Sequence, residues 1–379
     1  MTTSQALRDA LADRLKASGD LDDPAWERAA RDVPREAFVC DGFMRALPGT
    51  QPTLYEPVTP ADEGWLEGVY DDATLITQLD RHVRAVNVIA PTGGDPTSSS
   101  TLPSLVLRMW QQLGVDRQRV LEIGTGTGYS TALACHRLGE ANVTSVEVDA
   151  DNAERAAASL KQLGYAPTLL VGDGLDATVI DGDYDALIAT CAVRHIPYGW
   201  LDQVGDGGTV LVTLGGWMGA YGLVKLTVTG RGSATGRFLP GTTQFMIARP
   251  HSRPPRPPLV LLPGRTTTTE MPPVRLDDWT GRWVAQLAAP SAERLGGGQF
   301  QVLSDVATGS LAYFGVDEGG RTQVTQRGPI PLWDRVTDAL SEWEAAGAPH
   351  QSGFGMTITP EAQTVWIGDE GGPSWRLPV

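Results

Sequence analysis

The stretch Val120-Leu121-Glu122-Ile123-Gly124-Thr125-Gly126-Thr127-Gly128-Tyr129 decides how the rest of the chain is interpreted. A short apolar run with strand character leads into three glycines at alternate positions, and a segment with helical character follows. A strand that enters a helix through a turn almost without side chains lets backbone N–H groups approach a ligand closely. A dinucleotide fingerprint needs glycine at the first, third and sixth positions of that turn. The sixth position from Gly124 is Tyr129, so the chain lacks that fingerprint.

The pattern that remains is Glu-x-Gly-x-Gly-x-Gly, from Glu122 to Gly128, which is typical of S-adenosylmethionine (SAM) methyltransferases. The cofactor of these enzymes, SAM, has no pyrophosphate group, so the dinucleotide fingerprint is not needed to bind it. A second marker is Glu147, which lies near the end of the next expected strand, 19 positions after Gly128 (147 − 128). An acidic side chain about 20 residues on is where α/β nucleotide folds hold a ribose diol.

A third marker is Gly172-Asp173-Gly174, directly after a further expected strand, where an adenine amino group could be bound. Each marker alone also fits an ordinary turn. Because all three follow one another at the ends of successive strands, they predict a nucleoside-like ligand. The predicted cofactor-binding residues are Glu122, Gly124, Thr125, Gly126, Gly128, Glu147, Val148, Asp173 and Gly174.

Strands and helices are expected to alternate beyond Val120, which predicts an α/β fold with a Rossmann-like parallel sheet covered on both faces. Ligands of such sheets bind beyond the carboxyl ends of the strands. Two later strands are expected to close the sheet as an antiparallel hairpin. The expected strands are 119–124, 142–148, 167–172, 184–191 and 208–214, the helices 129–138, 151–163 and 196–204, and the hairpin strands 223–229 and 236–248.

Composition shifts divide the chain into four parts. The leucine spacing over 4–18 and the pair Asp23-Pro24 predict two N-terminal helices, and a strand is expected at 82–89. Prolines crowd the segment 250–258, and proline at this density cannot continue a helix or a sheet. The predicted parts are a helical, substrate-side segment (1–80), the nucleotide-binding domain (81–249), a proline-rich linker (250–258) and a C-terminal α+β extension (259–379). In the extension, strands are expected at 259–262, 300–304, 310–316 and 364–367, and a helix at 332–346.

Charge and cysteine content exclude several classes of function. The formal charge of −15 over 379 residues argues against a nucleic-acid partner, because phosphate binding needs basic patches. The three cysteines are far apart and the five histidines share no metal spacing, so neither disulfides nor a metal site is predicted. The first ten residues lack the apolar core of a signal peptide, and no apolar run reaches membrane-spanning length. These features predict a cytoplasmic protein without a membrane partner.

Over about residues 30–248 the chain resembles the protein-L-isoaspartate O-methyltransferase family. Several of the shared motifs lie outside the glycine loop, so the resemblance is specific to this family. They are Val33-Pro34-Arg35 with Phe38-Val39, Tyr70-x-Asp72, Thr101-x-Pro103 where the family usually has Ser-x-Pro, the glycine loop, Glu147, Gly172-Asp173-Gly174, Tyr184-Asp185-Ala186, Ile196-Pro197 and Gly207–Leu211. The resemblance implies SAM as cofactor, S-adenosylhomocysteine as product and a carboxylate as methyl acceptor.

Three departures from the repair enzymes are visible. The usual Gly-Gln lead-in to the catalytic loop is replaced by Thr97-Ser98-Ser99-Ser100, the loop after the fourth strand reads Cys191-Ala192-Val193-Arg194-His195, and about 130 residues follow residue 249 (379 − 249 = 130). These features resemble the branch found with biosynthesis of ribosomal peptides such as graspetides and lanthipeptides. That branch methylates a normal aspartate of a constrained precursor peptide, here one already crosslinked by a partner ligase, and the ester leads to aspartimide or isoaspartate.

The resemblance also suggests roles for individual residues. Thr101, with Ser99 and Ser100 beside it, would fix one oxygen of the acceptor carboxylate, while Arg194, His195 and Tyr70 would contact the substrate. The C-terminal extension would recognise the peptide. The alternatives are that Thr101 only caps the helix that follows, that Arg194 is a solvated charge, and that the hydroxyl-rich segment 91–101 is a flexible linker loop. For the whole protein, the alternatives are a housekeeping enzyme that repairs isoaspartate in damaged proteins and a non-catalytic SAM-binding scaffold.

Overall fold

The computed structural model describes residues 3–255 and 259–379. The chain divides into two compact units, one made of Met1–Thr190 with Gln203–Leu211 and the other of Cys191–Asp202 with Val212–Val379. Strands β8 (Ala186–Val193) and β9 (Thr209–Gly215) begin in the first unit and end in the second. The proline-rich segment 250–258 was predicted to separate two domains; its described part lies inside the second unit, and residues 256–258 lie outside the described residues.

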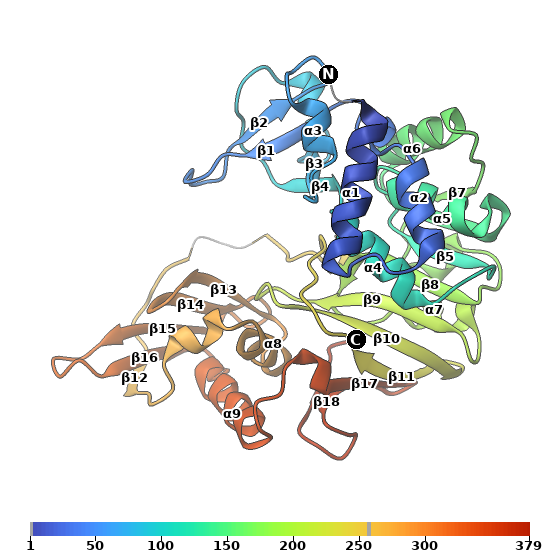
Figure 1. The fold of residues 1–379 in the computed structure, drawn as a ribbon. Helices are drawn as coiled ribbons and strands as arrows, with labels where there is room; N and C mark the ends of the chain where they lie inside the picture. Colours follow the sequence, from blue (N-terminus) through green and yellow to red (C-terminus); the bar gives the residue numbers. More distant parts are fainter. Residues whose placement is uncertain (1–2, 256–258) are drawn as a thin grey trace. The chain divides into compact units, whose positions relative to one another are not determined.

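The first unit contains a parallel sheet in the order β8-β5-β6-β7 (Figure 1). Strand β5 (Val120–Ile123) is buried along its whole length and pairs in parallel with β6 (Val143–Glu147) and with β8. Strand β7 (Thr168–Val171) forms the edge and pairs with β6. The register places Ile123 opposite both Val146 and Ala189, so the carboxyl ends of the strands meet at one edge of the sheet. The predicted α/β sheet is confirmed.

Helices of the first unit begin and end at residues whose chemistry explains these limits. Helix α1 is capped by Thr3, whose hydroxyl accepts from the Ala6 N–H, and it stops at Gly19, which has a φ of 79°. In α2, Asp23 accepts two backbone N–H groups at the start. The Trp26 and Trp110 rings stack at 5.5 Å and join α2 to α4. The helices are α1 (Ser4–Ser18), α2 (Pro24–Asp32), α3 (Trp65–Val69), α4 (Pro103–Leu113), α5 (Tyr129–Leu138) and α6 (Ala150–Gln162); α7 (Tyr198–Val204) spans residues of both units.

A second sheet of the first unit corrects the prediction for the hydroxyl-rich segment. The segment was expected to be a loop, but its second half forms β4 (Pro96–Ser100) in an antiparallel sheet with the order β2-β1-β3-β4. The other strands are β1 (Phe43–Ala46), β2 (Tyr55–Val58) and β3 (Leu75–Leu79). The strand predicted at 82–89 is wrong, because this segment forms turns and the short 3₁₀ helix Ala85–Asn87.

The second unit contains two antiparallel arrangements. In one, β10 (Tyr221–Gly230) and β11 (Ser233–Phe238) form the predicted hairpin, although β11 ends ten residues earlier than expected (248 − 238). The order continues from β10 through β11 to β17 (Phe354–Thr359), β18 (Ala362–Ile367) and β19 (Ser374–Arg376). Within the described residues, no helix is long and apolar enough to cross a bilayer.

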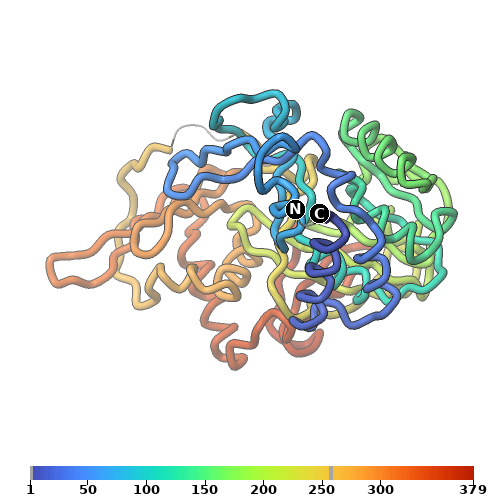
Figure 2. Tube along the Cα trace, turned by 45° about the horizontal axis from the view of Figure 1, so that its top comes forward, coloured from blue at the N-terminus to red at the C-terminus, as the bar shows by residue number. Residues whose placement is uncertain are grey.

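The other arrangement is a five-stranded sheet in the order β12-β16-β15-β14-β13, against which helix α9 packs, and helix α8 packs against α9. The hairpin of β15 and β16 extends away from the rest of this unit (Figure 2). The strand predicted at 259–262 is wrong: these residues are exposed and outside any strand. The strands are β12 (Arg265–Thr268), β13 (Ala292–Gly297), β14 (Phe300–Asp305), β15 (Leu311–Val316) and β16 (Thr322–Arg327), and the helices are α8 (Trp279–Ala288) and α9 (Leu332–Ala345).

Candidate active site

The glycine loop lies at the carboxyl end of β5. Gly124, Gly126 and Gly128 have φ angles of 101°, 56° and 92°, a region that residues with a Cβ adopt at a cost. A Cβ at Gly124 would lie 2.7 Å from the Thr190 hydroxyl oxygen, which itself donates to the Gly124 carbonyl at 2.5 Å. Position 124 therefore requires glycine, because of its positive φ angle and because of the close contact with Thr190 of β8.

Glu147, the last residue of β6, holds this loop. Its Oε2 accepts the Gly126 N–H at 2.7 Å and its Oε1 accepts the Asp149 N–H at 3.0 Å. The carboxylate is 7% exposed, so it lies at the edge of the interior, where a ligand could replace one of these donors. Val148 follows with 41% of its surface exposed, an apolar side chain next to the carboxylate.

The third marker also lies at this edge. Glu147 pairs with Val171 in the register of β6 and β7, and the turn with Asp173 follows β7. The Asp173 carboxylate accepts the Leu175 N–H at 3.0 Å. A Cβ at Gly174 would lie 2.7 Å from the Ile123 side chain, so glycine keeps this turn close to the end of β5. A bare loop and two acidic residues at the ends of three adjacent strands fit the adenosyl and amino-acid parts of SAM.

Two predicted cofactor residues lie beneath the loop and not on its surface. Glu122 is fully buried, and its Oε2 accepts the Thr131 hydroxyl at 2.5 Å and the Ser145 hydroxyl at 2.8 Å. Thr125 is 3% exposed and its hydroxyl lies 2.6 Å from that of Ser145. Burial raises the pKa of Glu122. In this structure both residues support the loop and offer no exposed side-chain atom to a ligand.

Strand β4 brings the hydroxyl-rich residues to the glycine loop. The Ser99 carbonyl oxygen lies 3.6 Å from where a Cβ on Gly126 would be. Because side chains alternate along a strand, Ser98 and Ser100 are buried, whereas Ser99 is half-buried and so is Thr101, just after the strand. Ser98 accepts from Thr77 at 3.3 Å and Ser100 from Arg35 at 3.3 Å. Among the described residues, nothing bonds the side-chain hydroxyls of Ser99 and Thr101.

Helix α4 does not use Thr101 as its cap. Its N-cap residue is Leu102, which makes no side-chain bond to the helix. The Leu102 N–H bonds to Thr74 at 3.2 Å, and the Ser104 N–H bonds to Asp72 at 2.9 Å. The capping alternative for Thr101 is therefore not what the structure contains, and its hydroxyl stays available.

The sequence prediction did not include Arg35, which holds the end of β4 in place. Its side chain is fully buried, and its guanidinium donates to five backbone carbonyls at 2.8–3.1 Å. These carbonyls belong to Val69, Asp71, Ala73, Ser100 and Thr101. Burial lowers the pKa of Arg35 to about 10, so it remains charged at neutral pH. Only its place in the shared Val33-Pro34-Arg35 motif marked this residue in the sequence.

Tyr70, predicted to contact the substrate, lies in the interior of the first unit. Its ring is 1% exposed, and its hydroxyl donates to Glu36. Burial raises the pKa of Tyr70, and the hydrogen bond with Glu36 raises it further. The structure therefore gives Tyr70 a packing role, and its contact with a substrate stays a prediction.

Arg194 and His195 belong to the second unit. The Arg194 guanidinium donates to the Pro290 carbonyl at 2.8 Å and lies 3.6 Å from the centre of the Trp217 ring. The His195 and His251 rings are 4.4 Å apart, and burial lowers the pKa of both, that of His251 to about 4. Their described partners lie in the same unit, and a contact with the substrate stays a prediction. No group of His, Cys, Asp and Glu side chains suited to a metal occurs in the part of the chain that the structure describes.

Known proteins resemble this chain over the same region. The family model described as protein-L-isoaspartate(D-aspartate) O-methyltransferase (PCMT) matches residues 74–229. A protein-L-isoaspartate O-methyltransferase of Ignicoccus hospitalis is 34% identical over 163 residues, which cover 42% of this chain and 76% of that protein. Protein-L-isoaspartate O-methyltransferase 1 of Rhodopseudomonas palustris is 30% identical over 260 residues, 66% of this chain and 89% of that protein. This chain belongs to the protein-L-isoaspartate O-methyltransferase family.

Membership of this family confirms the predicted enzyme class, a SAM-dependent carboxyl methyltransferase. The relative in Thermotoga maritima is 30% identical over 190 residues, which cover 49% of each chain. A solved structure titled protein-L-isoaspartate O-methyltransferase has the same fold, with a TM-score of 0.54 and 19% identity, and covers 96% of this chain and 100% of its own. The fold shared with that structure thus extends over most of the residues after 249.

Proposed function

We propose that the chain methylates an aspartate-derived carboxylate of a peptide or protein, and that an L-isoaspartyl residue is its first substrate class. The observation that carries this proposal is that the backbone of Ser99 lies beside the bare loop at Gly126, and that the hydroxyls of Ser99 and Thr101 have no partner among the described residues. Hydroxyls at that place can orient a carboxylate next to the cofactor. The names of the relatives favour isoaspartate over aspartate as the acceptor.

The reaction asks more of positioning than of acid–base chemistry. A carboxylate with a reference pKa near 3.9 is already ionised at neutral pH, so it attacks without a general base. SAM supplies the electrophilic methyl group. Rate enhancement then comes from holding the reacting atoms in line in a site that excludes water. A hydroxyl of Thr101 or Ser99 that donates to one carboxylate oxygen leaves the other oxygen free to attack.

The cofactor residues take the roles that their positions allow. The loop at Gly124, Gly126 and Gly128 gives backbone access to the amino-acid end of SAM. Glu147 receives the ribose, exchanging a loop N–H for a hydroxyl donor. Asp173 accepts from the adenine amino group, and Val148 offers an apolar surface to the ring. Arg35 lies behind β4, where its charge and its five bonds fix the backbone that carries Ser99 and Thr101.

The proposal is tested with two peptides that differ only in one residue, isoaspartate in one and aspartate in the other. Transfer of labelled methyl from SAM is measured on both, with SAM binding followed by calorimetry in parallel. We expect methylation of the isoaspartyl peptide and none of the aspartyl peptide. Turnover of neither peptide by a chain that binds SAM would contradict the proposal.

A second candidate substrate is an aspartate of a constrained ribosomal precursor peptide, as the sequence predicted. The run Thr97-Ser98-Ser99-Ser100 favours it, because it departs from the usual Gly-Gln of the repair enzymes at the strand beside the cofactor loop. In this case a crosslinked precursor peptide is methylated at aspartate, and the next backbone amide nitrogen then attacks the ester, which closes an aspartimide and releases methanol. Intact mass spectrometry detects this loss. The same proposal includes a partner ligase and a cytoplasmic location. It also assigns recognition of the peptide to residues 259–379 and contacts with the substrate to Arg194 and His195.

A further inference from the structure

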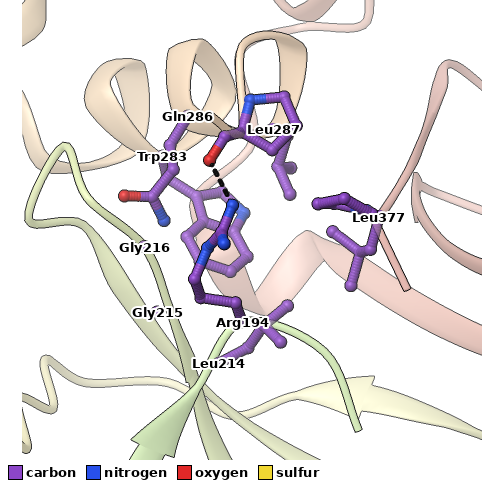
Figure 3. A pocket seen from close by; sticks show the side chains of 10 residues that line it. Arg194, Leu214, Gly215, Gly216, Trp283, Gln286, Leu287 and Leu377 are labelled. Atoms are coloured by element: carbon purple, nitrogen blue, oxygen red, sulfur yellow. Dashed lines mark hydrogen bonds between the residues drawn. The ribbon is translucent and has the colours of Figure 1, made fainter. Parts of the chain in front are cut away.

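A small slot in the second unit is lined by Arg194, whose contact with the substrate is part of the function proposed above. Its volume is about 10 Å³, which is room for about one water-sized group. Figure 3 shows the Arg194 side chain reaching past Leu214 toward Trp283, with Leu287 and Leu377 at the sides. The walls are mostly apolar, so the polar groups that reach the slot determine what it can bind.

Arg194 brings a positive charge that no carboxylate neutralises within the described residues. One of its N–H groups donates to the Pro290 carbonyl, and its plane stacks on Trp217. Burial lowers the pKa of Arg194, and no acidic group acts on it in the opposite direction. A guanidinium has five N–H donors, so donors remain after the single bond to Pro290.

Trp283 adds a second donor. Its side chain is fully buried, and its indole N–H has no acceptor in the part of the chain that the structure describes. Gln286 also lines the slot, and its side-chain amide is held by the backbone of Ala220, donating one N–H at 2.9 Å and accepting one at 3.3 Å. An unpaired buried donor is costly, so the arrangement has donors to spare and lacks an acceptor.

We propose that this slot binds one carboxylate group, held by the free guanidinium N–H groups of Arg194 and the indole N–H of Trp283. A carboxylate is the small acceptor that matches a guanidinium in geometry and supplies the missing negative charge. The slot has room for one oxygen atom of the carboxylate, and it excludes a ring or a bulky side chain. The group can come from a small organic acid or from a terminus or side chain of a peptide, and the inference does not depend on methyl transfer.

The test follows the indole N–H signals of the full chain by NMR after ¹⁵N labelling of its tryptophans. Trp283→Phe identifies the signal of Trp283. The protein is titrated with acetate, with acetamide as a neutral molecule of the same shape and with chloride as an ionic control. We expect a saturable shift of the Trp283 signal with acetate only.

Two arginine variants decide whether the shift is specific. Arg194→Gln should weaken acetate binding by about ten- to a hundredfold, the loss expected for a charge-assisted hydrogen bond. Arg237→Gln is the matched control, because Arg237 also stacks on a tryptophan of this unit, Trp366, at 4.4 Å, but does not line the slot. A Trp283 signal that moves equally with acetamide, or that still responds in Arg194→Gln, would overturn the proposal and leave a hydration site.

Peptides then identify the source of the carboxylate. A short peptide with a free C-terminus is compared with its amidated form, each with and without an acidic side chain. Loss of the Trp283 shift on amidation assigns the terminus, and loss on Asp→Asn replacement assigns the side chain. Methylation is measured separately on the same samples, so the failure of one proposal is distinguishable from the failure of the other.

Discussion

Two arginines, the buried Arg35 in the first unit and the half-buried Arg194 in the second, are bonded in opposite ways. Arg35 in the first unit gives its donors to five backbone carbonyls and to the Ser100 hydroxyl. Within the described residues, the guanidinium of Arg194 in the second unit makes one hydrogen bond, to the Pro290 carbonyl, and otherwise stacks on the Trp217 ring. A guanidinium whose donors are all used positions the backbone around it, whereas a guanidinium with donors left over can bind a ligand.

The comparison predicts its largest effect at Arg35. Arg35→Gln leaves several buried carbonyls without donors, so the free energy of unfolding should fall by about 3 kcal/mol or more. Methylation should fall with it because the end of β4 loses its support, and Arg35→Lys should restore part of both. Urea denaturation and a methyl-transfer assay measure these effects. A glutamine variant as stable as the unmodified protein would show that the five bonds do not hold this region.

The glycine loop should be nearly as sensitive. Gly124→Ala places a Cβ 2.7 Å from the Thr190 hydroxyl at a φ of 101°, so we expect a loss of about 2 kcal/mol of stability and weaker SAM binding by calorimetry. Gly19→Ala is the matched control, since Gly19 has a φ of 79° but open space around it. Equal SAM affinity in both variants would contradict the assigned role of the loop.

Removal of the Thr101 hydroxyl should lower the activity but not the stability. Thr101→Ala removes a group without a bond in the described structure, so the unfolding free energy should change by less than about 0.5 kcal/mol. Methyl transfer should slow by about tenfold, the loss of one hydrogen bond. Ser98→Ala, which breaks the buried bond to Thr77, should show the reverse pattern. If Thr101→Ala keeps full activity, we assign the orientation of the carboxylate to Ser99. A variant with both Ser99 and Thr101 replaced by alanine tests this assignment.

The histidine pair predicts a pH dependence for the second unit. Burial lowers the pKa of His251 to about 4, below the ordinary value near 6.5. The unfolded chain therefore binds more protons between these values, and stability should fall as the pH drops from about 6.5 to about 4. His251→Gln should flatten that slope in thermal denaturation. An unchanged slope in the variant would assign the acid sensitivity to other groups.

Of the two arginines, Arg194 should show the smaller effect on stability. Because the one hydrogen bond of its guanidinium within the described residues is to the Pro290 carbonyl, Arg194→Gln should change the free energy of unfolding by about 1 kcal/mol or less, as measured by urea denaturation. The loss in the free energy of unfolding should therefore be clearly smaller for Arg194→Gln than for Arg35→Gln. A loss as large as that of Arg35→Gln would place Arg194 among the supports of the fold and remove the reason to expect a ligand.

The sequence predicted the parallel sheet and most of its helices because their signals are local. Helix α5 has the predicted limits, and the markers Gly124, Glu147 and Asp173 lie at the ends of adjacent strands as expected. Strand β4 was missed because a run of hydroxyl residues has no apolar alternation; its order comes from pairing with β3 and from bonds such as that between Thr77 and Ser98. The apolar residues at 259–262 had strand character but no partner strand.

The side chains of the site were harder to predict than its backbone. Glu122 carries the motif, yet its place in a strand buried on both faces turns it inward. Arg35 and Thr190 act through contacts with residues more than 30 positions away, and no local pattern encodes such contacts. Spacing in the sequence thus located the edge of the sheet but could not tell which polar groups face a ligand.

The chain passes from one unit to the other three times, at residues 190, 202 and 211. No single cut can therefore release either unit as a continuous polypeptide. A fragment that ends before the proline-rich segment would keep Ile196 but lose Gln363, whose side chain binds both the N–H and the carbonyl of that residue. Fragments and fusions made at the apparent linker would separate such partners, so experiments on this protein are best designed around the entire polypeptide.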